Sequence, residues 1–470
     1  MTIPGSDAAS EPYDLVLRGG NVVDAQGPRA VDLAVRGGRV AAHLGRGQPA
    51  TALATLDVGG RYILPGLVDA HTHLREPGLT HKEDFATGTM AAAAGGVTTI
   101  LDMPTDEPWT DTAATLRDKL KLTRDRLRVD TAFQVAVRRD ARDLRAMRDE
   151  GAVSFEIFTA DVPLPYRHDT VDAIAAAMRK VADCDGLAGL QPSDESLLQA
   201  GIRADDGTIA GYGASRPPLA EAMGVAHAVL AAADTRARVH VRQIGAMPAL
   251  DAWRRLRERA DVTIETSVQN LLLTAERYRD LGAAIKASPP FREEADRRAL
   301  IEAIRNGSID MVVTDHAPHT PAEKQGHARF SDVPGGLPGL QTLLFCMLYL
   351  VDRGDLRLAD VVRLCAETPA QRFALPRKGS LAVGCDADLL VLAPGVTSTI
   401  GDGVSFSKAG LSPFAGLSMP YGLERVLLRG RTIWAGGDLS EGASGVVLRP
   451  NASEAKAQAG GPARSVMRRY

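Results

Sequence analysis

The stretch Tyr62-Ile63-Leu64-Pro65-Gly66-Leu67-Val68-Asp69-Ala70-His71-Thr72-His73 joins an apolar run to two histidines separated by one residue. The apolar run predicts a buried strand, and the side chains of a strand alternate between its two faces. His71 and His73 therefore project to the same side at the end of this strand, where both imidazoles can bind one metal ion at about 2 Å. Such a pair arises often by chance, so the remaining sequence has to support it.

The chain after this stretch alternates strands with helices. The strand-like segments 98–103 and 310–315 each follow a segment with the pattern of a helix. Repeated over about 300 residues, this alternation predicts an α/β fold of the (β/α)8 TIM barrel type. Active sites of such barrels lie at the carboxyl ends of the strands. His71 and Asp315 both fall at such ends.

Strand-like runs also flank the barrel region on both sides. Residues 13–64 carry short alternating runs separated by glycine pairs, and similar runs return between 388 and 430. We expect the two termini to form one small β-sandwich domain. The predicted units are the sandwich of residues 1–64 and 378–450, the barrel of residues 65–377, and a disordered tail of residues 451–470, which is rich in Ala, Gly and Arg.

Composition limits the possible function classes. The chain has 470 residues, 45% of them apolar, and a net charge of −3, which supports a large core and gives no basic surface for nucleic acid or membranes. The longest apolar stretch, 340–351, is shorter than the roughly 20 residues of a membrane span. No secretory signal is evident at the N-terminus, and the four scattered cysteines indicate reduced thiols. We expect a cytoplasmic protein.

Two further motifs connect the chain to a known family. Leu74-Arg75-Glu76-Pro77-Gly78 follows the histidine pair, and Thr314-Asp315-His316-Ala317-Pro318-His319 lies much later. Together they resemble the cyclic amidohydrolases, which include dihydroorotase, hydantoinase (dihydropyrimidinase) and allantoinase. The likeness covers nearly the whole chain. It implies a metal-dependent enzyme in a barrel, a cyclic amide or its ring-opened acid as substrate, and a homo-oligomer of two or four chains.

The resemblance also assigns metal ligands. Family members hold a first metal with the HxH pair and a late aspartate, which here are His71, His73 and Asp315, and Asp315 would also transfer the catalytic proton. A carboxylated lysine bridges two metals in the family. This chain has Glu156 in that place, and we expect its carboxylate to bind the metal. The alternative is a buried carboxylate paired with a nearby cation.

The positions of the second metal differ from the family pattern. Glutamines stand where histidines are expected, at Gln191, Gln243 and Gln269. Because a neutral amide is a poor zinc ligand, we expect one divalent metal ion, zinc, with manganese or iron as alternatives. Gln191 or Gln243 would instead donate a hydrogen bond to the substrate carbonyl.

The expected substrate contacts are mixed. Arg75 and His319 match family residues that hold a substrate carboxylate, and arginine offers a planar fork for such an anion. Thr105 stands where the family has a substrate-binding asparagine. The alternatives are an ion pair of Arg75 with Glu76, Glu83 or Asp84, and a loop hydrogen bond for His319.

Two functions follow from this sequence. The first is a one-metal hydrolase of a cyclic amide or imide, or a cyclase that runs the same reaction backwards. The second is a catalytically silent relative that keeps the fold for assembly or regulation with a partner enzyme. Loss of three expected histidines favours the second, whereas the combined presence of His71, His73, Arg75, Asp315 and His319 favours the first.

Overall fold

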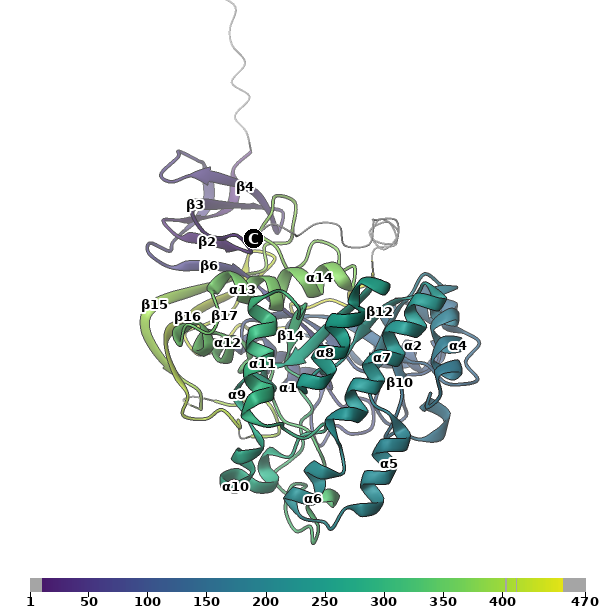
Figure 1. The fold of residues 1–470 in the computed structure, drawn as a ribbon. Coiled ribbons are helices and arrows are strands. Elements are labelled where there is room, and N and C mark those ends of the chain that lie inside the picture. Colours follow the sequence, from purple (N-terminus) through teal and green to yellow (C-terminus); the bar gives the residue numbers. More distant parts are fainter. Residues whose placement is uncertain (1–10, 402–403, 411, 451–470) are drawn as a thin grey trace, which may run out of the picture.

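A computed structural model describes residues 11–401, 404–410 and 412–450 of the protein. Within these ranges the chain forms a barrel surrounded by helices and a curled sheet that lies beside it (Figure 1). The tail of residues 451–470, predicted to be disordered, lies outside the described residues.

Eight parallel strands form the barrel, in the order of the chain. They are β7 (Leu67–Thr72), β8 (Val97–Asp102), β9 (Asp130–Ala136), β10 (Ser154–Phe158), β11 (Leu187–Gln191), β12 (Arg238–Val241), β13 (Val262–Ser267) and β14 (Met311–Val313). Hydrogen bonds connect each strand to the next, and contacts just past the last strand nearly close the ring. The His73 amide donates to the His316 carbonyl at 2.7 Å. The predicted TIM barrel is confirmed.

Helices follow each barrel strand and cover the outside of the barrel (Figure 1). The longer ones are α1 (Phe85–Ala94), α2 (Ala113–Leu122), α3 (Leu144–Glu150), α4 (Val171–Ala182), α5 (Glu195–Ala204), α6 (Ile209–Ala214), α7 (Pro218–Thr235), α8 (Met247–Leu256), α11 (Glu294–Arg305) and α12 (Leu343–Asp352). Short helices are α9 (Val268–Leu272), α10 (Tyr278–Leu281), α13 (Leu358–Val362), α14 (Thr368–Arg372), η1 (Leu164–Tyr166), η2 (Arg257–Arg259), η3 (Ala275–Arg277), η4 (Gly282–Ile285), η5 (Phe330–Asp332) and the π-turn η6 (Arg363–Glu367).

Local sequence explains where several helices begin. Asp84 caps α1 and Thr112 caps α2, in each case by accepting a hydrogen bond from the backbone three residues later. Pro218 occupies the first turn of α7, where a missing amide proton costs nothing. The helix expected before the strand-like segment 310–315 is α11, with Glu293 and Asn306 as its flanking caps.

Both termini contribute to the second sheet, as the sequence predicted. Its strands are β1 (Tyr13–Arg18), β2 (Asn21–Asp24), β3 (Gly27–Arg36), β4 (Arg39–Gly45), β5 (Ala52–Asp57), β6 (Tyr62–Pro65), β15 (Leu389–Thr399), β16 (Ser418–Leu428), β17 (Arg431–Ala435) and β18 (Asp438–Leu439). They form one curled ten-stranded sheet, in which β6 lies between β2 and β15. The exact domain limits given above stay a prediction.

The apolar run of residues 62–68 is divided between the two sheets. Residues Tyr62–Pro65 pair with the curled sheet, and Leu67–Thr72 begin the barrel. Gly66 separates them, and a Cβ atom at this position would lie 2.1 Å from the Thr98 hydroxyl. A side chain at residue 66 is therefore excluded by the close approach of β8.

One buried apolar cluster combines residues of several barrel strands with residues next to them. Val68 of β7 and Leu101 of β8 belong to it, as do Val153, which directly precedes β10, and Phe373, which follows α14. In the described part of the chain, no helix has the length and apolar character needed to cross a membrane.

Candidate metal centre

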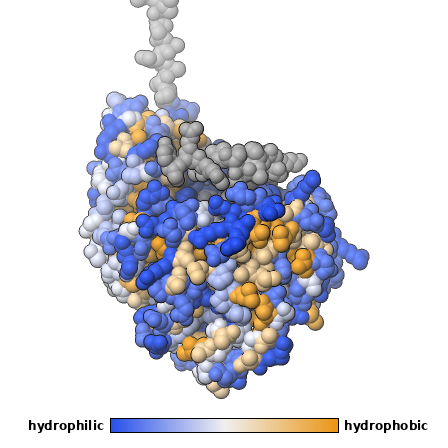
Figure 2. All heavy atoms as spheres, in the orientation of Figure 1, coloured by the Kyte–Doolittle hydropathy of each residue, from blue (hydrophilic) through white to orange (hydrophobic). Residues whose placement is uncertain are grey.

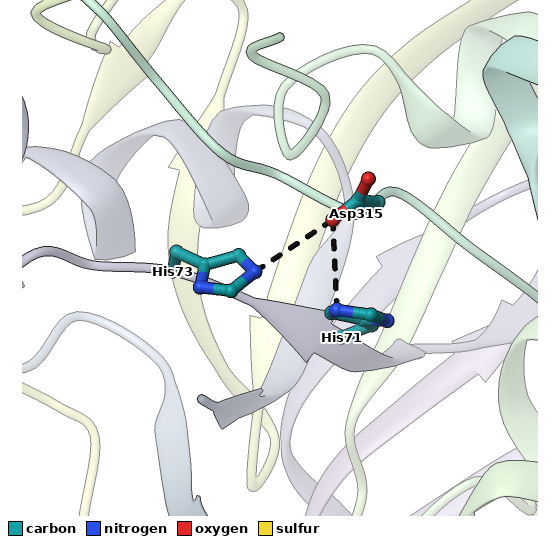
Figure 3. Close-up of side chains that lie close together, drawn as sticks. All are labelled: His71, His73 and Asp315. Atoms are coloured by element: carbon teal, nitrogen blue, oxygen red, sulfur yellow. Dashed lines mark ion pairs between the residues drawn. The ribbon is translucent and has the colours of Figure 1, made fainter. Parts of the chain in front are cut away.

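Three of the predicted ligands converge at the carboxyl ends of strands. His71 lies in β7, His73 follows that strand, and Asp315 follows β14. The Oδ1 atom of Asp315 lies 3.5 Å from His71 Nε2 and 3.7 Å from His73 Nε2 (Figure 3). One ligand atom from each residue lies within 4.8 Å of the other two. Donors at such separations fit around a metal ion with bonds of about 2 Å.

Hydrogen bonds on the far side of each ring leave both Nε2 atoms facing the centre. His71 Nδ1 lies 2.6 Å from Glu265 Oε1, and His73 Nδ1 lies 2.8 Å from the Thr105 hydroxyl. A carboxylate only accepts, so the proton of this bond belongs to His71 Nδ1. The Thr105 hydroxyl can accept from His73 in the same way. A metal-binding histidine is commonly oriented by such a contact of its other nitrogen.

The ionisation of the three groups follows from burial and neighbouring charge. Burial raises the pKa of Asp315 to about 6, although the nearby His71 opposes the shift. Burial lowers the pKa of His73 well below its ordinary value, so this ring is neutral at pH 7. For His71, burial is outweighed by Glu265 and Asp315, and the pKa is raised. A metal would therefore compete with a proton for His71 Nε2.

Strained backbone gathers at the same end of the barrel. Arg75, Gln243 and Asp315 have φ angles of 61°, 49° and 49°, in the left-handed region that residues with a side chain rarely adopt. Such conformations cost roughly 1–3 kcal/mol each and persist where the surroundings determine them, commonly at binding sites.

Glu156 lies deeper in the barrel than the three converging residues. Its carboxylate receives two hydrogen bonds from the Arg242 guanidinium, with Nη2–Oε1 at 2.7 Å and Nε–Oε2 at 3.1 Å, and a third from Ser154 at 2.7 Å. Among the described residues it is not part of the group of converging ligand atoms. This contact favours the alternative of a buried carboxylate paired with a cation. Metal binding by Glu156 stays a prediction that this arrangement does not support.

Two of the three glutamines that stand in place of histidines bond to each other. Gln191 Nε2 donates to Gln243 Oε1 at 2.6 Å. Gln243 also donates a hydrogen bond that opposes the raised pKa of Asp315. Gln269 Nε2 approaches the other Asp315 oxygen at 3.3 Å. The amides therefore surround the carboxylate of the candidate centre.

Arg75 is a buried arginine whose guanidinium is only partly satisfied by the protein. The alternatives named from the sequence do not occur, because the three carboxylates bond elsewhere: Glu76 to Arg126, Glu83 to Ser407, and Asp84 to Lys408. In the described part of the chain, the buried Nε of Arg75 has no hydrogen-bond partner. Burial lowers the pKa of Arg75, against the charges of Asp315 and Asp106. This guanidinium is available to an anionic or carbonyl group of a ligand.

His319 lies near the same cationic region. Its Nδ1 lies 3.4 Å from Lys82 Nζ and 3.8 Å from a Glu323 oxygen. Burial, with Arg75 and Lys82 nearby, lowers the pKa of His319 to about 3. The ring is thus neutral at pH 7 and can accept or donate a hydrogen bond without adding charge. Thr105, by contrast, is engaged with His73, so its predicted contact with substrate stays untested.

The residues that sequence reasoning missed lie behind His71. Glu265 in β13 and Arg242 after β12 are buried, and Glu265 also accepts from His240 Nε2 at 2.8 Å. Arg242 and His71 keep the pKa of Glu265 well below its ordinary value, against the effect of burial. An acidic residue inside the otherwise uncharged run 262–268 was the one available signal.

Comparisons with known proteins agree with this geometry. The model of the dihydro-orotase-like family matches residues 60–247, and that of the amidohydrolase family matches residues 262–433. The chain is 35% identical to an allantoinase of Streptomyces avermitilis, over 91% of this chain and 97% of that protein. It is 32% identical to a dihydroorotase of Methanothermobacter thermautotrophicus, over 82% and 87% of the two chains. An L-hydantoinase (dihydropyrimidinase) structure from Arthrobacter aurescens superposes with a TM-score of 0.88 at 29% identity, covering 93% of this chain and all of that one.

By its fold the protein is a TIM barrel, with a candidate metal site at the carboxyl ends of its strands, where such barrels have their active sites. The identity and coverage of these relatives go further. The chain belongs to the cyclic amidohydrolase superfamily.

Proposed function

We propose that the protein is a hydrolase of a cyclic amide or imide that uses a single divalent metal ion, with zinc expected and manganese or iron as alternatives. The observation that carries the proposal is the convergence of His71 Nε2, His73 Nε2 and Asp315 Oδ1 at the barrel mouth. The family relatives, named allantoinase, dihydroorotase and hydantoinase, support the reaction class.

A single metal fits the residues better than two. A second ion would need anionic or imidazole ligands, and the amides of Gln191 and Gln243 are weak ligands that already bond to each other. Glu156 is neutralised by Arg242, so its carboxylate is not free to bridge. We therefore propose His71, His73 and Asp315 as the complete set of protein ligands.

The bound metal would supply a water activated near neutral pH and a Lewis acid for the scissile carbonyl. Asp315, besides holding the metal, would act as base and then as acid, taking a proton from the attacking water and delivering it to the leaving ring nitrogen. Gln191 and Gln243 can donate hydrogen bonds to the oxygen that becomes negative as the carbonyl is attacked. The same residues serve ring closure, because an enzyme lowers the barrier in both directions.

The expected substrate carries an anion or a carbonyl group next to the amide that reacts. Arg75 supports this, since its buried Nε atom has no hydrogen-bond partner among the described residues and a guanidinium can form a bidentate contact. The neutral His319 ring can add one hydrogen bond beside it. The ring-opened acid, with its new carboxylate, is held by the same pair in the reverse reaction.

Exposed apolar residues support the proposal of a homo-oligomer. Leu219 and Leu230 on α7 are 55% and 50% exposed, and Met247 on α8 is 43% exposed. Figure 2 shows apolar residues among hydrophilic ones on the face where these helices lie. Association of two or four copies through the barrel helices would cover them.

Metal content per chain, measured by mass spectrometry on protein purified without chelators, tests the proposal. The wild type should hold close to one metal, and His73→Ala should hold almost none. His168→Ala is the matched control, because His168 is buried but bonds to the Tyr166 carbonyl instead, and it should keep the metal. Cyclic amides and imides are then assayed with both proteins. A wild type without metal, even after metal is added, would contradict the proposal and favour the catalytically silent alternative.

A further inference from the structure

Arg242 has an unusually complete set of partners for a buried arginine. Its side chain is 0% exposed, and each of its N–H groups has an acceptor. The acceptors are Glu156 Oε2 and Oε1 at 3.1 and 2.7 Å, the Ala70 carbonyl at 3.0 Å, Glu265 Oε2 at 3.2 Å, and the Gln134 side-chain oxygen. The guanidinium thus links β7, β9, β10 and β13 at one point inside the barrel.

Glu265 connects Arg242 to the candidate metal centre by hydrogen bonds. Its Oε2 atom accepts from Arg242 and from His240 Nε2, while its Oε1 atom accepts from His71 Nδ1. His240 is fixed in turn, because its Nδ1 lies 2.8 Å from the Thr263 hydroxyl. Since a carboxylate only accepts, His240 donates from Nε2, and the neutral ring then accepts from Thr263 at Nδ1. With both rings neutral, a single arrangement of protons satisfies these contacts.

We propose that Arg242 is a positioning residue that acts through Glu265, fixing His71 with its proton on Nδ1 and its Nε2 atom toward the metal. The inference rests on the proposed function, in which His71 binds the metal. It adds a residue that touches neither metal nor substrate. Arg242 is also the internal cation that allows Glu156 and Glu265 to be buried close together.

Removing the cation should change the centre in a specific way. Without Arg242, Glu265 retains two imidazole donors but loses the charge that holds Oε2, and Glu156 loses its main partner. Glu265 is then free to rotate away from His71, and the ring can turn or exchange its proton to Nε2. Contacts to the second nitrogen of a metal-binding histidine typically contribute 10- to 100-fold, roughly, to metal affinity.

The first test needs no variant of Arg242 and no metal. Nitrogen-15 NMR of histidine-labelled, metal-free protein at pH 8, with His71→Gln used to assign the signal, reports which His71 nitrogen carries the proton. We expect a protonated Nδ1 with a strongly hydrogen-bonded proton. A proton on Nε2 alone would overturn the proposal. Because no metal is involved, this result stands whether or not the proposed function fails.

The second test measures zinc affinity by chelator competition and the visible spectrum of the cobalt-loaded protein. Arg242→Met and Glu265→Gln should each bind zinc about 10- to 100-fold more weakly, with a changed cobalt spectrum. Arg242→Lys, which keeps the charge, should recover part of the affinity and serves if Arg242→Met fails to fold. The matched control is Lys378→Met, which removes another buried cation. Lys378 lies 2.5 Å from Asp130, at the start of strand β9 and away from the candidate centre.

Lys378→Met should lose stability and keep wild-type zinc affinity and spectrum. A folded Arg242→Met protein with wild-type affinity and spectrum would overturn the proposal. Equal loss of affinity in Arg242→Met and Lys378→Met would overturn it as well, because it would reduce Arg242 to a general structural role. Failure of the proposed function looks different: the wild type itself would bind no metal.

Discussion

Thr105 holds one of the two imidazoles of the candidate centre by a single hydroxyl. Its Oγ1 atom lies 2.8 Å from His73 Nδ1, on the side of the ring opposite the centre. The two histidines are therefore held differently, His71 by a buried carboxylate and His73 by a neutral group. A neutral acceptor orients the ring without adding negative charge beside the metal.

Replacing this hydroxyl should weaken metal binding without disturbing the fold. Thr105→Val keeps the shape of the side chain but removes the acceptor, so we expect zinc affinity to fall by roughly 10-fold. Thr105→Ser keeps the hydroxyl and should remain close to the wild type. Chelator competition measures both, and equal affinities for Thr105→Val and the wild type would show that the contact does not orient His73.

For individual residues, the sequence predicted the three converging side chains better than the side chains that hydrogen-bond to them. His71 and His73 are recognisable from their spacing at the end of a strand, and the resemblance to the cyclic amidohydrolases adds Asp315. The partner of Glu156 could not be predicted in the same way. Arg242 comes 86 residues later, directly after strand β12, and no local pattern connects the two. The contact depends on which side chains the barrel interior brings together.

A glycine in strand β11 provides the space for the buried ion pair of Glu156 and Arg242. Gly189 in β11 lies directly opposite Glu156 in β10. A Cβ atom at residue 189 would lie 2.1 Å from one carboxylate oxygen of Glu156 and 2.2 Å from the other. The carboxylate is fixed by Arg242 and Ser154 and cannot move aside without losing those bonds. The glycine is required by its neighbour and not by its own backbone conformation.

Gly189→Ala should accordingly destabilise the protein by roughly 1–3 kcal/mol, the usual cost of overpacking a core. Urea unfolding measures the change. Gly213→Ala in α6 is the control, because a Cβ atom there meets nothing within 4 Å. It should leave stability unchanged or raise it by up to about 1 kcal/mol, as expected for glycine replaced in a helix. Equal stability of Gly189→Ala and the wild type would contradict the packing argument.

The alternation of strand-like and helix-like segments was predicted well, as for α11, which precedes the strand-like segment 310–315. The run 62–68 was harder, because it gives no sign that its halves pair with different sheets. The glycine that divides the run is explained by the approach of Thr98, which lies on β8 and is distant in sequence. Local sequence thus predicted strand character but not the sheet to which each half belongs.

For the whole molecule, a buried group of charges joins the barrel to the curled sheet. Lys378 Nζ lies 2.5 Å from Asp130 and 2.8 Å from both Asp386 and Asp388. Arg429 adds a second cation, 2.6 Å from Asp130. Asp130 begins the barrel strand β9, whereas Asp388 immediately precedes β15 of the curled sheet. With a lysine among them, these carboxylates serve as a connection between the two sheets.

Lys378→Met should lower the free energy of unfolding by roughly 3–5 kcal/mol, because it leaves buried carboxylates without their main cation. Denaturant unfolding at pH 7 measures the loss. Lys121→Met is the control, since the side chain of Lys121 is 71% exposed and its pair with Asp118 should contribute less than about 1 kcal/mol. A loss below about 1 kcal/mol for Lys378→Met would contradict the proposed connection.

The strand order of the curled sheet also limits when this sheet can form during synthesis. Tyr62 of β6 pairs with Leu392 of β15, a residue made about 330 positions later. At roughly 5–20 residues per second, the ribosome needs some tens of seconds to produce that partner. In this interval one edge of β6 has unpaired backbone N–H and C=O groups. Such an edge can pair with another chain and start aggregation unless a chaperone covers it. All barrel strands precede β15 in the sequence. The barrel can therefore form before the last strands of the curled sheet have been synthesised.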